Sequence, residues 1–525
     1  MVTQLCNTQQ SNIISRESIT ELDFHHLFRA FFIQSRKPDE DVHNFLQTYL
    51  TSDPDEIRRR SSIFGGLMSN PKNRSLIKLS IDQHNKLASS LWVIFEKQRP
   101  IVTYIQNLYA LEAYISSIEC MEKVFDVDAG HEIAKIAETI QNEKSSPFYI
   151  QALDTLNRVK GLLDPLKDVT LAVNLTSYGD GLQMGITGIN QSEKAVGIFS
   201  GIDESPSSLT GFTPVGLSSR RLYITIEEYI LTQVEKKWAQ PLRTAIRLFN
   251  KIDTSKLHEW NNWQKNMSIF HIGLAVMDKF AEEGYTLCRP EPCTDRFDME
   301  EMYYPHMALT KGGPVPQSIR FSTGETILIT GANNSGKTSA LKTFAQNCLL
   351  AQLGLWVPSQ DFSFVPFKKW LNVFSSGEDN EMRVSRFQQE SEKINAAREV
   401  ADTGTCLLLN EPFTSTNPAK ASDLLKEIVM DLQQKGVTSI LVTHNFDVCK
   451  KLKSAGAGLR SYVTEAEPTP SGMNHTYKLT EKEPDGLSHA KLLAKEYGFT
   501  FDNLVEMTSE TQQLEAFLMG GGDDA

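Results

Sequence analysis

The stretch TILITGANNSGKT, residues 326–338, decides the fold of the C-terminal part of this 525-residue chain. Its first five residues are apolar or β-branched and predict a buried strand. An apolar helical pattern follows from Ser339 to Leu350. Between strand and helix, Gly331 to Thr338 fits the pattern G-x-x-x-x-G-K-[ST]. This strand, loop and helix unit is typical of an α/β domain whose loop binds phosphate groups.

The residue types of this loop suit ATP and Mg²⁺. The glycines let successive backbone N–H groups point at phosphate oxygens, and the helix N-terminus adds a favourable partial charge. Lys337 is expected to reach the β- and γ-phosphates, and the Thr338 hydroxyl is expected to coordinate Mg²⁺. The expected cofactor-binding residues of the loop are Gly331, Asn333, Asn334, Ser335, Gly336, Lys337, Thr338 and Ser339.

Two further strands are expected to deliver polar residues to the same sheet edge. The apolar run from Cys406 to Leu409 ends in Asn410 and Glu411. We expect Asn410 on the metal side, although it brings no negative charge, and Glu411 as the general base that polarises the attacking water. The strand from Ser439 to Thr443 leads into His444, which we interpret as a sensor of the γ-phosphate.

The rest of the chain is predominantly helical by its apolar spacing. An exception is a stretch beginning at Val169, whose β-branched residues, glycines and polar interruptions predict strands. The group Asp53-Pro54-Asp55-Glu56 predicts a helix start, and the arginines that follow at 58–60 are either a phosphate-binding patch or, as we favour, a solvated helix face that pairs with these acids. We expect an α/β P-loop ATPase domain, preceded by an all-helical core and lever region with a small β-containing insertion. The expected divisions are a first helical part at 1–125, long helices at 126–262 with the insertion at about 168–215, a helical return and connector at 263–310, the ATPase domain at 311–505, and a C-terminal helix and tail at 506–525.

The amino-acid composition bears on which partners and which cellular compartment can be expected. Lys and Arg number 53 against 65 Asp and Glu, which gives a net charge of −12. A chain covered in non-specific nucleic-acid contacts normally has a basic footprint instead. The sequence has no apolar run of membrane-spanning length and no secretory signal pattern, and its seven cysteines are scattered. We therefore expect a cytoplasmic protein without a membrane partner.

The motifs together resemble the ATPase domain of the MutS family, over about residues 310–500. The resemblance rests on Gly331–Thr338, the run Ala351–Pro358, Glu411–Pro418 and Thr443-His444. It implies that the ATPase domain is of the ABC type and that Gln352 also belongs to the cofactor-binding set. It further implies that Ser385, in an element similar to the family's S-T-F-x-x-E, contacts the nucleotide of the opposite subunit. Two chains facing head to tail would then build two composite sites, so a homodimer or a pair with a sister MutS-like chain is expected.

The departures from the family pattern bear on function. Asn410 stands where the family has Asp, which implies slower hydrolysis or a nucleotide-binding regulator with little turnover. The first 90 residues contain no F-x-E mismatch wedge, and the segment from Val169 to Ile202 is short and poor in basic residues.

Two functions are therefore expected. The first is a dimeric ATPase acting on DNA structure, in mismatch repair or recombination-type processes. The alternative is a MutS-like ATPase that remodels or reactivates a protein partner. The net charge favours the alternative, while the family resemblance and the arginines at 58–60 and 220–221 favour DNA.

Overall fold

The computed structural model describes residues 13–32, 37–69, 72–93, 100–125, 131–163, 169–175, 182–189, 232, 235–236, 238–310, 312–374, 383–469 and 472–484. These residues belong to two compact units. The first unit contains the chain between residues 72 and 271, and the second combines residues 13–69 with the chain from 272 to 484. The first helices along the sequence thus fold with the C-terminal part of the chain.

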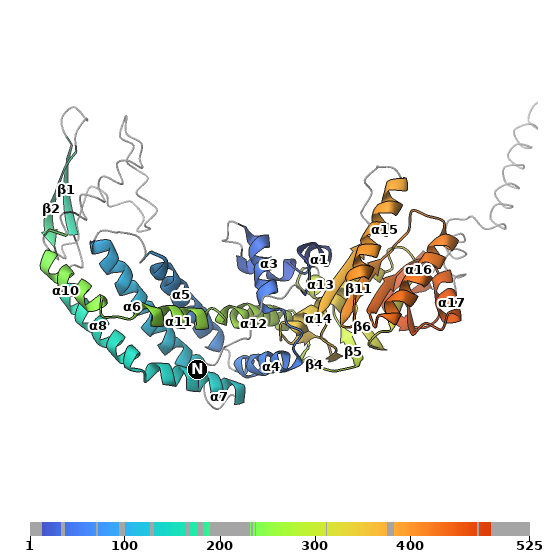
Figure 1. Ribbon diagram of the computed structural model, residues 1–525, viewed down its shortest axis with the longest axis horizontal. Coiled ribbons are helices and arrows are strands. Elements are labelled where there is room, and N and C mark those ends of the chain that lie inside the picture. Colours follow the sequence, from blue (N-terminus) through green and yellow to red (C-terminus); the bar gives the residue numbers. More distant parts are fainter. Residues whose placement is uncertain are drawn as a thin grey trace, which may run out of the picture. The chain divides into compact units, whose positions relative to one another are not determined.

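The first unit is built from long helices that pack along one another (Figure 1). Pro100 and Pro147 each begin a helix, where the missing N–H group is tolerated. Trp260 donates a hydrogen bond of 2.8 Å to Ser117 Oγ in the interior. None of the helices in the described part of the chain is long and apolar enough to cross a bilayer. The elements of this unit are α5 (Lys72–Val93), α6 (Pro100–Val124), α7 (His131–Lys144), α8 (Pro147–Leu163), β1 (Val169–Leu175), β2 (Leu182–Ile189), α10 (Ala239–Phe249), α11 (Thr254–Gln264) and the start of α12 (Met267–Glu282).

In the described part of the predicted β insertion, two strands form an antiparallel pair. Strands β1 and β2 align from Val169 opposite Ile189 to Leu175 opposite Leu182, with one irregularity after Thr170. Residues 190–231, most of which belong to the predicted insertion, lie outside the described residues, as does the C-terminal helix expected at 506–525.

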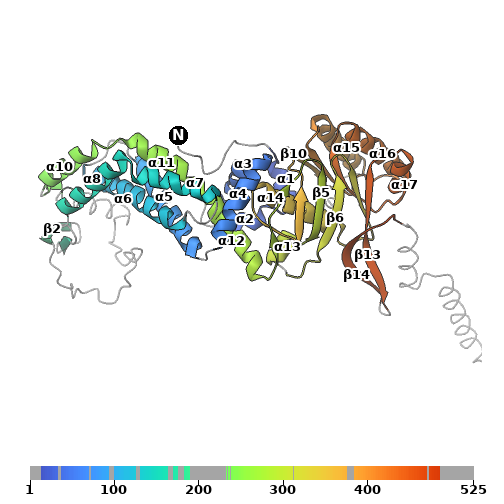
Figure 2. The same ribbon diagram turned by 90° about the horizontal axis from the view of Figure 1, so that it is seen from below.

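The second unit contains a six-stranded sheet in the order β10-β11-β12-β7-β13-β14. All neighbours in it are parallel except β13 and β14, which form a long antiparallel hairpin (Figure 2). A four-stranded sheet in the order β4-β9-β5-β6 and the short pair of β3 with β8 complete the strands described here. The bounds are β3 (Leu287–Cys288), β4 (Glu291–Pro292), β5 (Arg296–Met302), β6 (Gln317–Ser322), β7 (Thr326–Thr330), β8 (Val357–Pro358), β9 (Asp361–Phe364), β10 (Lys369–Phe374), β11 (Thr405–Asn410), β12 (Thr438–Val442), β13 (Leu459–Thr469) and β14 (Gly472–Glu481).

Both faces of the parallel strands are covered, which explains their continuous apolar sequences. Leu407, Leu409 and Leu441 belong to a core formed with residues of helices α15 to α17. The alternate residues Leu408 and Ile440 are also fully buried, and α14 contacts β12. The helices of the second unit are α1 (Arg16–Glu21), α2 (His26–Arg29), the 3-10 turn η1 (Ala30–Phe32), α3 (Pro38–Tyr49), α4 (Pro54–Met68), the end of α12, α13 (Pro305–Thr310), α14 (Lys337–Gln352), α15 (Arg383–Val400), α16 (Pro418–Gln434) and α17 (Asp447–Ser454).

The N-terminal residues of this unit extend the parallel sheet at its β10 edge. Ile14 forms a parallel bridge with Trp370, and the Trp370 N–H donates a bond of 2.7 Å to the Ile13 carbonyl. A little further on, Asp23 accepts a hydrogen bond of 2.7 Å from Lys342 of α14. The segment from Ile13 to Asp23 is therefore attached both to a strand and to a helix of the α/β domain.

Helix α4 contains a buried ion pair and lies close to the turn at Gly354 of the same domain. Asp53 caps its N-terminus by accepting from the Asp55 N–H, as the sequence predicts. Arg60 is fully buried and contacts Glu56 Oε1 at 2.6 Å. A Cβ atom on Gly354, whose φ is 84°, would overlap the Arg60 Cβ. Pairing of this helix's arginines with its own acids is thus present, but Arg60 is in the core and not on a solvated face.

Candidate functional site

A cavity of about 850 Å³ lies at the carboxyl ends of β7 and β11. Parallel pairing sets Ile329, Val442 and Asn410 level across three strands, so the residues that follow them meet at one sheet edge. The cavity is lined by Tyr304, Met307, Gly313, Pro314, Val315, Gln317, Asn333, Asn334, Gly336, Lys337, Thr338, Ser339, Ala340, Thr343, Asn410, Glu411 and Tyr477.

The loop between β7 and α14 has the backbone that the glycine pattern requires. Gly331 and Gly336 have φ of 151° and 90°, and Asn334 has φ of 60°. These values lie in the region that disfavours β-branched and bulky residues. Helix α14 begins directly at Lys337, so its free N–H groups face the cavity. The local geometry is therefore that of an anion-binding helix N-terminus.

Lys337 is held at the centre of the site. Its side chain is 4% exposed, and its ammonium group donates a hydrogen bond of 2.8 Å to the Ala332 carbonyl. The same group forms an ion pair of 3.3 Å with Glu411 Oε1. A buried cation at the loop suits a phosphate group, which would compete with Glu411 for it.

Thr338 and Asn410 lie together beside this pair. The Thr338 hydroxyl donates to Asn410 Oδ1 at 3.0 Å. Glu411 follows with φ of 51° and its N–H bonded to the Val442 carbonyl at 2.8 Å, so the strained backbone is held by the neighbouring strand. One hydroxyl, one amide oxygen and one carboxylate are oxygen donors of the kind that Mg²⁺ prefers. These residues therefore fit a magnesium ion accompanied by phosphate oxygens.

The opposite wall is apolar and aromatic. Val315 and Tyr477 line it, and a Cβ atom on Gly336 would lie 3.1 Å from the Tyr477 ring. Gln317 fixes this wall because its amide donates to the Tyr477 carbonyl at 2.7 Å and accepts from the Leu479 N–H at 2.8 Å. Sequence patterns gave no signal for Tyr477, which comes from an ordinary alternating strand far along the chain.

Several predicted site residues do not line this cavity. Gly331 and Ser335 form the underside of the loop, where Ser335 is 1% exposed. Gln352 is fully buried at the other end of α14, about 22 Å from Lys337 at 1.5 Å per residue. Its amide donates to the Phe367 carbonyl and accepts from the Trp370 indole, so it packs the helix end instead of reaching a nucleotide at the loop. The backbone of Ser385 lies in the first turn of α15, and its side chain is outside the described residues.

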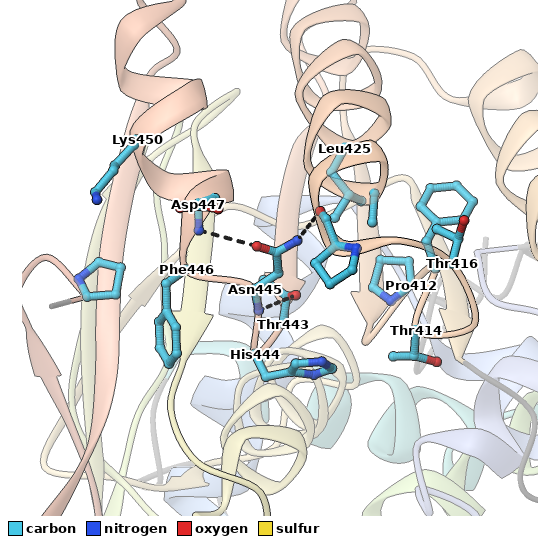
Figure 3. Close-up of a pocket in the computed structure, with 14 residues that line it drawn as sticks. Pro412, Thr414, Thr416, Leu425, Thr443, His444, Asn445, Phe446, Asp447 and Lys450 are labelled. Carbon is cyan, nitrogen blue, oxygen red and sulfur yellow. Dashed lines mark hydrogen bonds between the residues drawn. The ribbon is translucent and has the colours of Figure 1, made fainter. Parts of the chain in front are cut away.

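His444 lines a neighbouring cavity of about 510 Å³ (Figure 3). The walls of that cavity come from the loop after Glu411 and from the turn between β12 and α17. Asn445 connects the two walls, since its side chain donates to the Pro418 carbonyl at 2.6 Å and accepts from the Asp447 N–H at 3.3 Å. His444 is thus placed beside the catalytic candidates but is not brought into the cavity of Lys337.

Comparison with known proteins agrees with this geometry. Residues 327–509 match the family model of MutS domain V. The endonuclease MutS2 of Maridesulfovibrio salexigens is 30% identical over 205 residues, which are 39% of this chain and 26% of that protein. The endonuclease MutS2 of Thermomicrobium roseum is 31% identical over 199 residues, 38% of this chain and 25% of that protein. The matched region thus spans about a quarter of the length of these curated relatives.

The second unit is an α/β domain with a glycine-rich loop between a central parallel strand and a helix N-terminus, the class of protein in which such loops bind phosphate. Through residues 327–509 this domain is similar to domain V of the MutS family.

Proposed function

We propose that this protein binds and hydrolyses ATP with Mg²⁺ at the cavity between the loop and β11. The observation that carries the proposal is that two bonded pairs line one cavity: Thr338 donates a hydrogen bond to Asn410, and Lys337 forms an ion pair with Glu411. In this proposal the loop N–H groups and Lys337 bind the phosphates of ATP, and the adenine ring packs on the apolar wall that contains Tyr477. Mg²⁺, held by Thr338 and Asn410 together with phosphate oxygens, supplies charge stabilisation when bound.

The residues of this chain have distinct roles in the proposed reaction. Lys337 leaves Glu411 for the phosphates, which frees the Glu411 carboxylate to accept a proton from the attacking water. Asn410 orients the Thr338 hydroxyl without adding charge. His444 senses the γ-phosphate, and Ser385 contacts the nucleotide of the opposite chain in a dimer. The dimer is of two identical chains or of this chain with a sister MutS-like chain.

For the target of the ATPase cycle, we propose DNA of unusual structure, because residues 327–509 match MutS domain V. The relatives named above are called endonucleases, but the matched region covers about a quarter of each. The test is steady-state ATP hydrolysis at ~150 mM salt with duplex, mismatched and four-way-junction DNA, because phosphate contacts weaken as salt rises. Stimulation or suppression by one DNA form supports the proposal, and a rate indifferent to all of them contradicts it.

One observation favours the alternative, an ATPase that remodels a protein partner. The arginines of α4, which the sequence offered as a phosphate-binding patch, are engaged within the protein. Arg58 contacts Asp55 and Glu291, and Arg59 and Arg60 contact Glu56. Arg220 and Arg221 lie outside the described residues. If DNA has no effect on hydrolysis, a nucleotide-dependent pull-down with Glu411→Gln protein is the experiment that tests this alternative.

A further inference from the structure

The underside of the phosphate-binding loop rests on strand β13. Val463 of β13 pairs with Thr330 of β7, so the next residue, Thr464, lies level with the first residue of the loop. A Cβ atom on Gly331 would overlap Thr464 Oγ1. Thr464 is 1% exposed and therefore has no water to satisfy its hydroxyl.

Thr464 is bonded to the loop through Ser335. The two hydroxyl oxygens are 2.6 Å apart, and the Ser335 hydroxyl donates to the Ala332 carbonyl at 2.7 Å. A hydroxyl has a single hydrogen, so Thr464 is the donor in the hydroxyl pair. The Thr330 carbonyl is a more distant partner of Thr464, at 3.4 Å.

The chain of hydrogen bonds continues to the reactive groups. The Ala332 carbonyl that accepts from Ser335 also accepts from Lys337 Nζ at 2.8 Å, and Lys337 pairs with Glu411. A side chain on β13 is thereby linked, through one serine and one carbonyl, to the lysine of the proposed ATP site. The hairpin contacts the loop a second time where Tyr477 packs on Gly336.

We propose that Thr464 is a positioning residue, which fixes the phosphate-binding loop and, through Ser335 and the Ala332 carbonyl, the ammonium group of Lys337. This inference rests on the proposed ATPase function only for its effect on turnover. The effect of Thr464 on the position of the loop follows from the hydrogen bonds and packing described above, whether or not the loop binds ATP.

The test compares Thr464→Val, Thr464→Ser and Ser335→Ala in the full-length protein. Valine keeps the β-branched shape but places a methyl group 2.6 Å from Ser335 Oγ, where roughly 3.5 Å is needed, so the loop must move by roughly 1 Å. Serine keeps the hydroxyl. Thr480→Val is the matched control because Thr480 is on the neighbouring strand, opposite Val463, and does not line the ATP cavity.

Two readouts separate this inference from the proposed function. Hydrogen–deuterium exchange of the amides at 331–338, without any nucleotide, should be faster in Thr464→Val than in wild type or Thr480→Val, and Thr464→Ser should restore protection. With ATP, Thr464→Val should raise KM roughly three- to tenfold, as expected for one lost hydrogen bond, and should lower kcat about tenfold or more.

Each outcome decides one claim. Unchanged exchange at the loop in Thr464→Val overturns the positioning role, whatever the ATPase activity. A role confined to stability would lower the melting temperature while leaving KM and the exchange of the loop amides at the values of the control, and that result also overturns the proposal. Wild-type protein that neither binds nor hydrolyses ATP contradicts the proposed function, while the exchange comparison still decides the role of Thr464.

Discussion

The hydroxyl of Thr338 donates a hydrogen bond of 3.0 Å to the side-chain oxygen of Asn410. An aspartate at position 410 could accept the same bond and would add a negative charge beside the proposed metal. Affinity for a divalent cation rises with the charge of its ligands. We therefore expect Asn410→Asp to lower the Mg²⁺ concentration needed for half-maximal ATP hydrolysis by about tenfold, which corresponds to ~1.4 kcal/mol.

Asn410→Ala is the control for this prediction, since it removes the oxygen as well as leaving the site without charge. It should raise the Mg²⁺ requirement. If ATP hydrolysis depends on the Mg²⁺ concentration in the same way in wild type, Asn410→Asp and Asn410→Ala, residue 410 does not coordinate the metal.

Glu411→Gln tests the general base. The amide cannot accept the proton of the attacking water, so turnover should fall by about a hundredfold or more. Affinity for ATP should be retained, because the change also removes the carboxylate that competes with phosphate for Lys337. Glu399, an exposed residue near the end of α15, provides the control variant Glu399→Gln. Turnover in Glu411→Gln equal to that of the control would mean that another group activates water.

The strands and helices next to the ATP cavity were predictable because their signals are local. The apolar runs before Gly331 and Asn410 and the capping pattern at Asp53 each depend on residues close in sequence, and all three elements are present. Thr464 and Tyr477 were not predictable, because their contact with the loop arises from strand pairing across more than a hundred residues.

The burial of Arg60 was missed for a related reason. Three consecutive arginines after acids indicate a solvated face, and only the close approach of Gly354 from a distant turn encloses the middle of that helix. The same long-range packing explains Gln352, whose place in a motif run indicated a ligand although its amide joins three segments of the core.

Gly354→Ala should destabilise the protein for two separable reasons. The residue has φ of 84°, which costs about 1–2 kcal/mol for alanine, and the new Cβ would overlap Arg60. Gly284 has nearly the same φ, 85°, with nothing within 4 Å, so Gly284→Ala reports the backbone cost alone. We expect Gly354→Ala to lower the free energy of unfolding by roughly 1–3 kcal/mol more than Gly284→Ala. If denaturant titrations give the same loss of unfolding free energy for both variants, α4 can shift away from Gly354 without a measurable cost.

The Glu56 ion pair predicts an acid-dependent stability. Burial raises the pKa of this carboxyl, but hydrogen bonds and charges from Arg59 and Arg60 outweigh burial, and the pKa is lowered from 4.5. A lowered pKa means that the stabilisation is complete above pH 4.5 and is lost as the pH falls through the folded value. Glu56→Gln should cost about 3–5 kcal/mol near pH 7, because Arg60 stays buried without its carboxylate.

The difference between wild type and Glu56→Gln should therefore shrink as the pH falls below 4.5 and through the lowered pKa of Glu56, where the wild-type carboxyl also becomes neutral. Urea titrations at several pH values measure this difference. Asp55→Asn, at an exposed position of the same helix, is the control and should show a small difference at every pH. A constant gap between wild type and Glu56→Gln would place the cost in packing and not in charge.

The bridge between Ile14 and Trp370 has a consequence for how the protein is made. Ile13 and Ile14 are synthesised long before strand β10, whose edge they cover. The whole helical unit is synthesised in between. The N-terminal segment must therefore wait for its partner during synthesis, while the helical unit can already form from contiguous chain. Completion of the α/β unit becomes a late event that joins two segments separated in sequence by the helical unit.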